Sequence, residues 1–479
     1  MSIESKGVLL ADSMGLGKSY QSMAVAVYLK INKGIKKCLI ICPATTKHAV
    51  WEKEIQKHTN EDCIIVGGPK QKRMKQIEDY FMSPFILFLV VGFESFRADL
   101  KTYKKFGDPW NLIIIDESVR IKNPRSQITE AVKEFSPAYK IALSGWPLAN
   151  RVEDIWSQVD WINPGCFGSY WSFEDTYMQT LKIPVDRYSK DKADPSKPQK
   201  YFKEIIGYKN LDKLKEKLAP LYIRRLKENV LDLPPKIYSD REVELVSEQK
   251  KAYKSMKEEM LLFVRTMKEQ DVLVKAQSIL IQMLRLSQIT SGFITDVSME
   301  NPTWFENSAK LKIIQEIVEE TIASGDKIVL WSRWVPMVKH LIKTYSVSPY
   351  NAVCISGFVK DQERKEAVYS FQNDPTCRVF VGQVQSGGMG IDLYAGNVQI
   401  FIDKAFLSPS TVLQAEDRQF RIGQTKTVVI INLFAKDTID VYWEKLLKKK
   451  KKIANTIFDE KDMSAPPKTT KEDILELLQ

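Results

Sequence analysis

The residues with the clearest chemical potential lie near the N-terminus, in the stretch ADSMGLGKSYQ from Ala11 to Gln21. It departs from the phosphate-binding pattern G-x-x-x-x-G-K-[ST] at Asp12, where the pattern has glycine. An apolar run, Gly7–Leu10, precedes the stretch, and a helical pattern, Ser19–Lys30, follows it. This strand–loop–helix order predicts a phosphate loop; the alternative is a glycine turn that only opens a helix.

Each residue type in the predicted loop has a chemical reason to be there. Gly15 and Gly17, with Leu16 between them, allow the backbone to turn tightly, so that its N–H groups face phosphate oxygens. Lys18 would neutralise charge on the β- and γ-phosphates, and the Ser19 hydroxyl would bind Mg²⁺.

A second candidate is the acidic pair Asp116–Glu117, which ends the apolar run "NLIIID". Two carboxylates at the end of a strand suit metal-assisted hydrolysis: Asp116 would hold Mg²⁺, and Glu117 would orient and deprotonate water. An ordinary helix start is the alternative. The presence of Lys18 upstream favours the catalytic interpretation.

A third candidate is "QAEDRQFRIGQ", Gln414–Gln424. If this segment is helical, Arg418 and Arg421 share one face. Arginines presented to a γ-phosphate from a separate lobe act as fingers, which predicts a site built across two lobes.

The elements that must position these residues are two series of short apolar runs. Runs that are apolar throughout are typical of parallel strands covered on both faces. The first series is Gly7–Ala11, Cys38–Pro43, Phe85–Val91, Asn111–Asp116 and Lys140–Gly145. The second is Lys327–Ser332, Asn351–Ser356, Arg378–Gln383, Val398–Asp403 and Thr427–Phe434. We therefore predict an α/β protein with two tandem parallel-sheet lobes.

Segments between these runs suggest the domain boundaries. The stretch Leu231–Tyr238 carries a Pro-Pro pair that stiffens the chain. We expect a first lobe over residues 1–235, with a helical insertion at about 160–220, and a second over 236–479, with a helical protrusion at about 245–295. The polar stretch Tyr188–Lys200 is expected to be an exposed loop.

Composition points to a polyanionic partner. The chain has 479 residues, a formal net charge of +11 and a pI near 9.0, which suits nucleic acid first and an acidic membrane second. No signal peptide or membrane-spanning run is apparent, and its six cysteines form no C-x-x-C pair. We expect a cytoplasmic or nuclear protein with reduced thiols, monomeric, with no membrane partner.

Several motifs, in order, resemble those of the Swi/Snf-type ATPases of helicase superfamily two. "DSMGLGKS" is similar to the family's D-E-M-G-L-G-K-T, which accounts for Asp12, and "DESVRIKN" to D-E-A-H-R-I-K-N. The remaining similar stretches are Leu39–Ile55, Leu143–Asn150, Ala219–Lys236, Val381–Asp403 and Gln414–Gln424. The segment Ile205–Pro220 resembles the annealing-helicase branch more locally.

The resemblance implies two RecA-like lobes and a site for ATP and Mg²⁺. It implies that Gly390 and Asp392 line this site from the second lobe, that Gln414 contacts the nucleotide region, and that both arginines are fingers. The nucleic-acid contacts that it implies are Thr45, Lys47, Ser332, Arg333, Gln385 and Ser386. Backbone contacts suit a motor that must tolerate every sequence.

The sequence departs from the family at three points. Val119 stands in the place of the histidine of D-E-A-H, and Trp146 in that of the second threonine of T-G-T-P, so the coupling of hydrolysis to movement is in question. The upstream glutamine motif that recognises adenine has no room before Gly7. Either the base is held differently, or selectivity for ATP is relaxed, or the chain starts within a longer relative's sequence.

The expected function is an ATP-driven translocase on duplex, forked or branched DNA, suited to branch migration, fork remodelling, repair or recombination. One alternative is a strand-separating helicase on DNA or RNA. Another is a non-enzymatic DNA-binding scaffold with a degenerate ATP site. The tail Lys448–Lys452 is either a solvated helix face, a phosphate-contacting strip or a brace onto the first lobe.

Overall fold

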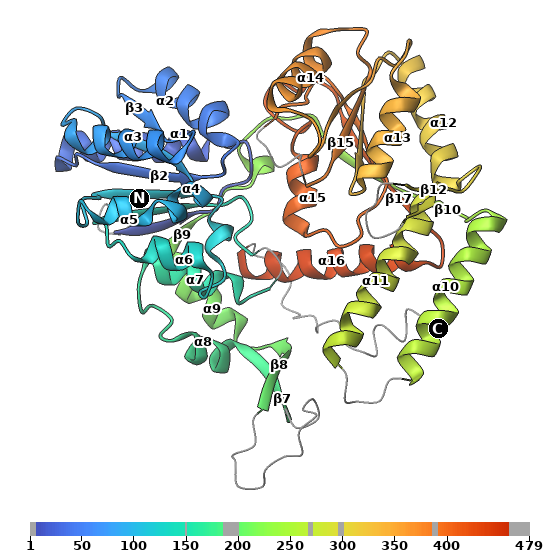
Figure 1. The fold of residues 1–479 in the computed structure, drawn as a ribbon, viewed down its shortest axis with the longest axis horizontal. Helices are drawn as coiled ribbons and strands as arrows, with labels where there is room; N and C mark the ends of the chain where they lie inside the picture. The colour runs from blue at the N-terminus through green and yellow to red at the C-terminus, as the bar shows by residue number, and fades with distance from the viewer. Residues whose placement is uncertain are drawn as a thin grey trace. The chain divides into compact units, whose positions relative to one another are not determined.

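The computed structural model describes residues 6–148, 151–184, 201–266, 272–295, 301–385 and 391–458. It contains two large parallel sheets flanked by helices (Figure 1), which confirms the predicted fold class. Contacts divide the chain into two compact units. The first comprises Met1–Met178, Lys209–Asp232 and Lys452–Ser464, and the second comprises Gln179–Tyr208, Leu233–Lys451 and Ala465–Gln479, as far as these residues are described.

The first unit is built on a seven-stranded sheet in the order β3-β4-β2-β5-β6-β1-β9. All its neighbouring strands are parallel. The strands are β1 (Gly7–Leu10), β2 (Cys38–Cys42), β3 (Cys63–Ile65), β4 (Phe88–Gly92), β5 (Leu112–Asp116), β6 (Tyr139–Leu143) and β9 (Tyr222–Ile223). All five runs predicted from the sequence are strands, whereas β3 and β9 were not predicted.

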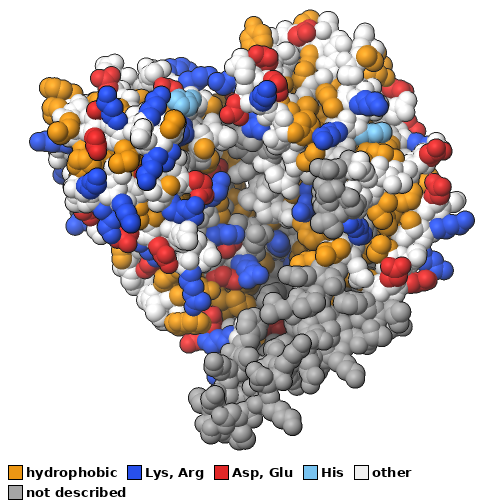
Figure 2. Space-filling view, viewed as in Figure 1, with side chains coloured by type: hydrophobic (Ala, Val, Ile, Leu, Met, Phe, Trp, Pro, Cys, Tyr) orange, Lys and Arg blue, Asp and Glu red, His pale blue; other side chains and the backbone are white. Residues whose placement is uncertain are grey.

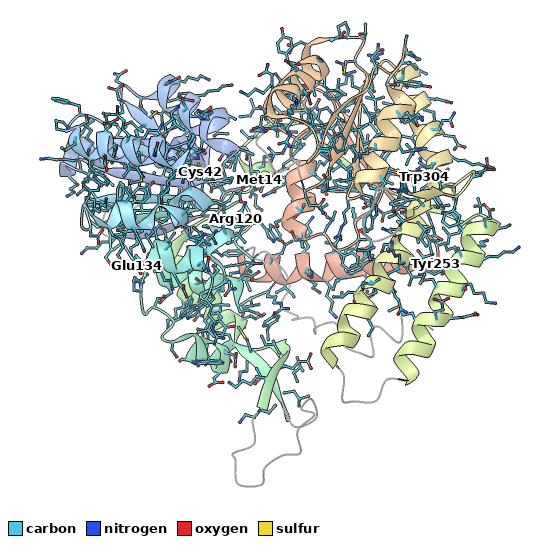
Figure 3. The ribbon with its side chains drawn as sticks, in the orientation of Figure 1. Met14, Cys42, Arg120, Glu134, Tyr253 and Trp304 are labelled. Carbon is cyan, nitrogen blue, oxygen red and sulfur yellow. The ribbon has the colours of Figure 1, made fainter. Side chains whose placement is uncertain are left out.

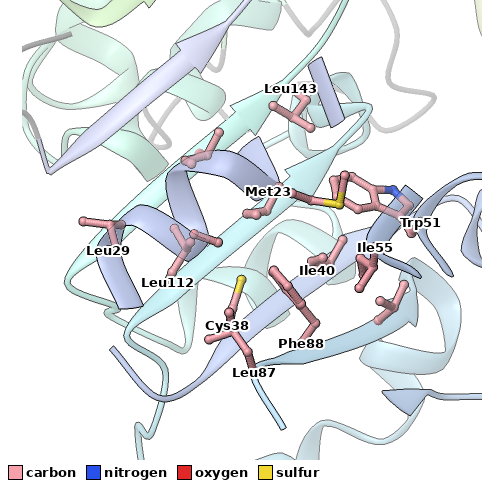
Figure 4. Packing of buried hydrophobic residues seen from close by; sticks show 14 of the residues in the cluster. Met23, Leu29, Cys38, Ile40, Trp51, Ile55, Leu87, Phe88, Leu112 and Leu143 are labelled. Carbon is pink, nitrogen blue, oxygen red and sulfur yellow. The ribbon is translucent and has the colours of Figure 1, made fainter. Parts of the chain in front are cut away.

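Apolar side chains close the core between this sheet and its helices. Figure 4 shows Met23 of α1 (Lys18–Lys33) and Trp51 among residues of β2, β4 and β5, and all of them belong to one buried cluster. At Gly7 the backbone passes so close to α7 (Asp154–Ile162) that a Cβ atom would lie 2.1 Å from the carbonyl oxygen of Ile162. Glycine is therefore required where β1 meets α7.

Other helices of the first unit connect its strands. They are α2 (Lys53–His58), α3 (Lys70–Met82), α4 (Phe93–Ala98), α5 (Leu100–Lys104) and α6 (Gln127–Lys133). The segment expected to be a helical insertion holds α8 (Tyr170–Tyr177) and α9 (Leu211–Leu218), but also a two-stranded sheet of β7 (Met178–Pro184) and β8 (Tyr201–Tyr208). Most of the predicted loop at 188–200 lies outside the described residues.

The second unit is built on a six-stranded sheet in the order β10-β17-β16-β13-β15-β14. Its strands, also parallel, are β10 (Lys236–Val243), β13 (Ile328–Ser332), β14 (Val353–Ile355), β15 (Val379–Gln383), β16 (Val398–Phe401) and β17 (Val428–Ala435). Successive residues of β13 enter different clusters: Ile328 and Leu330 pack on one face, Val329 and Trp331 on the other. Both faces of this sheet are therefore buried.

Helices flank the second sheet, and two further helices fall in the segment expected to be a helical protrusion. These two helices are α10 (Ser247–Thr266) and α11 (Val272–Ser291), and after them β11 (Phe293–Ile294) pairs with β12 (Thr303–Trp304). The remaining helices are α12 (Ala309–Ala323), α13 (Val335–Tyr345), α14 (Asp361–Asn373), α15 (Pro409–Glu416) and α16 (Ile439–Phe458). In the described part of the chain, no helix combines the length and the apolar character needed to cross a membrane.

Candidate nucleotide and nucleic-acid site

The glycine-rich stretch forms a loop between β1 and α1. Gly15 and Gly17 have φ values of 83° and 71°, which are unfavourable for residues with a side chain. No acidic residue lies in the first turn of α1, so the positive end of its dipole is available to an anion. The Lys18 ammonium donates to the carbonyl oxygens of Asp12 (2.8 Å) and Ser13 (3.2 Å) and so closes over the loop.

The acidic pair lies at the carboxyl end of β5, and its backbone is unusual. Asp116 is the last residue of the strand, and Glu117 follows in the left-handed region with φ 53°. Its backbone N–H donates to Asp116 Oδ1 at 3.0 Å. A non-glycine residue in this conformation is disfavoured and must be held by its surroundings, as is common at functional sites.

The loops that follow β1, β5 and β6 converge, because the carboxyl ends of these neighbouring parallel strands lie on the same side of the sheet. Burial raises the pKa of Asp116, while the Trp51 hydrogen bond, the nearby Lys18 charge and the Glu117 N–H oppose this rise. Gly145, after β6, allows close approach: a Cβ there would lie 2.7 Å from Met14 Cγ and 3.6 Å from Lys18 Nζ. Met14 and Cys42, labelled in Figure 3, mark the loop and the end of β2.

Trp51 is a site residue that sequence reasoning missed. It lies in η1 (Lys47–Glu52), a turn of π-helix, is fully buried, and its indole N–H donates to Asp116 Oδ2 at 3.0 Å. Single π-helical turns are rare and often occur at functional sites. The stretch Leu39–Ile55, which holds the predicted nucleic-acid contacts Thr45 and Lys47, is thus hydrogen-bonded to Asp116 through Trp51.

Replacing Trp51 by Phe should destabilise the first unit. Most of the side-chain volume is kept, but the half-buried Asp116 carboxylate loses a donor, which costs about 1–3 kcal/mol and raises the pKa of Asp116 further. Urea unfolding followed by circular dichroism measures the loss. Trp161→Phe is the matched control, because the equally buried Trp161 indole N–H has no acceptor among the described residues. Equal losses in the two variants would contradict the role of this hydrogen bond.

The predicted arginine fingers lie just beyond α15, not within it. The helix ends at Glu416 and the chain turns, so Arg418 and Arg421 do not lie on one helical face. Both side chains nevertheless converge on the Ile391 carbonyl oxygen, at 3.3 and 3.4 Å, and Arg421 forms an ion pair with Asp392. The second unit thus brings both arginines to the Ile391 carbonyl oxygen and Arg421 also to Asp392, whereas Gly390 lies outside the described residues.

Gln414 lies on α15. The C-terminal end of this helix is held by Lys236, the residue that follows the Pro-Pro pair. Lys236 pairs with Glu416 and Asp417, each at 3.3 Å, and Glu416 also accepts a hydrogen bond from Tyr238 at 2.8 Å. Glu416 is only 4% exposed. The start of β10 is therefore held to the helix that precedes the arginines.

The six predicted nucleic-acid contacts differ in accessibility. Thr45 and Gln385 are exposed. Lys47 is buried and donates to the Val66 carbonyl oxygen at 2.6 Å, and Ser332, also buried, donates to Asp403 Oδ2 at 2.6 Å.

Arg333 is half-buried against the Phe406 ring and donates to the Ala405 carbonyl oxygen at 2.9 Å. Ser386 lies outside the described residues.

On the visible face of the first unit, lysine and arginine side chains are interspersed with acidic and apolar ones (Figure 2).

The two departures from the family pattern occupy different environments. Val119 is half-buried in the short 3₁₀ helix η2 (Ser118–Ile121). Trp146 is 8% exposed, and the Arg224 guanidinium lies 5.7 Å from its ring centre. Arg224 lies equally close to the ring of Phe458, the last residue of α16. The tryptophan is thus part of a local aromatic–cation cluster of the first unit.

Comparison with known proteins places this site in a family. The sequence matches the SNF2-related domain over residues 1–292, more than half of the chain, and the helicase conserved C-terminal domain over residues 309–423.

Named relatives agree with these matches. The "uncharacterized ATP-dependent helicase MG018" of Mycoplasma genitalium is 30% identical over 91% of this chain and 38% of its own length. The "ATP-dependent DNA helicase DDM1" of Arabidopsis thaliana is 27% identical over 98% of this chain and 62% of its own. The chain therefore spans less than two thirds of the length of either relative.

Among solved structures, the "Sulfolobus solfataricus SWI2/SNF2 ATPase core in complex with dsDNA" is 28% identical, with 95% of this chain and 89% of that chain covered and a TM-score of 0.40. The family match over residues 1–292 is decisive. The chain belongs to the SNF2-related family.

Proposed function

We propose that this protein hydrolyses ATP and uses the energy to move along duplex or branched DNA. The observation that carries the proposal is the meeting of Lys18, Asp116 and Gly145 at one edge of the first sheet. A relative's name, "ATP-dependent DNA helicase", and the net charge of +11 support DNA as the track.

The residues present fit a magnesium nucleotide. Mg²⁺ usually takes only one or two protein ligands, with phosphate oxygens and water completing its shell. Ser19, in the first turn of α1, and Asp116, at the end of β5, would be those ligands. Bound there, Mg²⁺ would neutralise charge on the β- and γ-phosphates.

The chain's own groups would then act on the substrate. Backbone N–H groups of the loop from Gly15 to Gly17 would bind phosphate oxygens. The Lys18 ammonium would release the carbonyl oxygens of Asp12 and Ser13 and bind the γ-phosphate instead. Glu117 would accept the proton of the attacking water. Arg418 and Arg421 are proposed to stabilise negative charge on the transferred phosphoryl group. To do so they would give up their present contacts with Ile391 and Asp392 when nucleotide binds.

ATP hydrolysis measured with different nucleic acids tests this function. We expect strong stimulation by duplex, forked and four-way DNA and little by RNA. Stimulation by RNA alone would contradict the proposed track, and absence of hydrolysis under all conditions would support the scaffold alternative. A fork-unwinding assay with a trap strand separates translocation from strand separation.

A further inference from the structure

We infer that Arg225 is a positioning residue for the phosphate loop, and that through it nucleotide binding is coupled to the segment leading out of the first unit. The inference rests on the proposed function, because it assigns the loop to nucleotide phosphates. Arg225 follows β9, 213 residues after Asp12, within the family-like stretch Ala219–Lys236.

The backbone of this segment is paired with the loop itself. β9 lies parallel to β1, and the pairing continues past the strand: Ala11 N–H donates to Ile223 O at 2.7 Å, and Ser13 N–H donates to Arg225 O at 2.9 Å. The first two residues of the loop, Asp12 and Ser13, are thus held by residues more than 200 positions later.

The side chain of Asp12 is the centre of the connection. The Asp12 carboxylate is fully buried and accepts three hydrogen bonds from Arg225. The donors are the Arg225 backbone N–H at 2.8 Å, Nε at 3.2 Å and Nη2 at 2.7 Å. A buried carboxylate requires such partners, since an uncompensated charge away from water is strongly unfavourable. This explains why aspartate is tolerated where the general loop pattern has glycine.

Gln21 extends the network across the loop. Its Nε2 donates both to Asp12 Oδ2 at 3.0 Å and to Leu16 O at 2.9 Å, and its Oε1 accepts from Arg225 Nη2 at 2.5 Å. One side chain therefore joins the beginning of the loop to its end, and Arg225 fixes that side chain. Because Arg225 itself contacts no phosphate-binding N–H, it acts by holding the loop in the binding conformation.

Thermodynamic coupling is reciprocal, so an anion that stabilises the loop must also stabilise the Arg225 segment. The test uses the full chain and two probes, inorganic tripolyphosphate and ADP, with affinities measured by calorimetry. Arg225→Ala should weaken both probes about 10- to 100-fold, as for other partners that orient binding groups. Arg225→Lys keeps the positive charge but loses the planar guanidinium with its two parallel donors, and it should weaken binding of the two probes less.

Arg73→Ala is the matched control. Arg73 holds another buried carboxylate of the same unit, Asp99, through Nε at 2.6 Å and Nη2 at 3.0 Å. This variant should lose stability but keep the wild-type affinity for tripolyphosphate. Hydrogen exchange adds a readout independent of the variants: tripolyphosphate should slow exchange of the Arg225 amide in the wild-type protein.

Wild-type affinity in Arg225→Ala, or equal weakening in Arg73→Ala, would overturn the inference while leaving the proposed function intact. An Arg225 amide unaffected by bound tripolyphosphate would do the same. If the wild-type protein bound neither probe, the proposed function would fail together with the inference.

Discussion

Lys18→Ala should lower the rate of ATP hydrolysis about 10²- to 10³-fold, the usual loss when one preorganised donor to a developing charge is removed. The Lys18 ammonium lies over the loop, hydrogen-bonded to the carbonyl oxygens of Asp12 and Ser13, and its charge opposes the rise that burial causes in the pKa of Asp116. Without it, the loop has no side-chain cation for the β- and γ-phosphates. Steady-state phosphate release in the presence of duplex DNA measures the effect.

DNA affinity provides the internal control for this variant, because the proposed contacts with DNA phosphates lie outside the phosphate loop. The affinity for DNA should remain close to wild type in Lys18→Ala. Lys33→Ala, at the other end of α1, removes the same charge from an exposed position and should hydrolyse ATP normally. Wild-type turnover in Lys18→Ala would refute the assignment of the loop.

Glu117→Gln should lower the hydrolysis rate about 10²- to 10⁴-fold, the range for loss of a general base, with nucleotide affinity largely retained. The backbone of residue 117 lies in the left-handed region and its N–H donates to Asp116 Oδ1. The substitution leaves this backbone bond in place, so the isosteric glutamine side chain can occupy the position of the Glu117 side chain. The amide cannot accept a proton from water. Single-turnover hydrolysis measured beside ADP binding separates the chemical step from affinity.

The exposed acidic residue Glu130, in the first turn of α6, provides the comparison for Glu117. Glu130→Gln should be indistinguishable from wild type in both assays. A Glu117→Gln protein with normal single-turnover rates would show that another group activates the water.

Most strands of the two sheets were predictable because their runs are apolar throughout; β3 (Cys63–Ile65), only three residues long, was missed although it shares that character. Such runs can be stable only with both faces covered, and β13 shows this pattern with successive residues in different clusters. The other two missed strands, β9 and β10, lack that signal. β9 has only two residues and exists through its pairing with β1, and β10 carries mostly polar, exposed residues along its length.

Within the site, motif residues were predictable because their chemistry is local. Lys18, Asp116 and Glu117 stand in strand–loop and strand–end contexts that sequence patterns describe well. Trp51 and Arg225 were not predictable in their roles, because their partners lie 65 and 213 residues away. A buried tryptophan usually indicates core packing, and only the indole N–H on Asp116 distinguishes this one.

The lysine tail Lys448–Lys452 lies on α16. Lys448 lies on α16 with a side chain 65% exposed, and it is 3.6 Å from both Asp240 and Glu444. Exposed pairs of this kind contribute little to stability. A solvated helix face accounts for Lys448, and a phosphate contact by its neighbours stays a prediction.

The central claim, that ATP hydrolysis drives movement along DNA, is tested most directly by displacement of a third strand from a DNA triplex. A translocase removes the third strand as it passes along the duplex, without separating the duplex itself. We predict ATP-dependent displacement by the wild-type protein and none by Lys18→Ala at equal DNA occupancy. Hydrolysis stimulated by DNA with no displacement of the third strand would contradict the account.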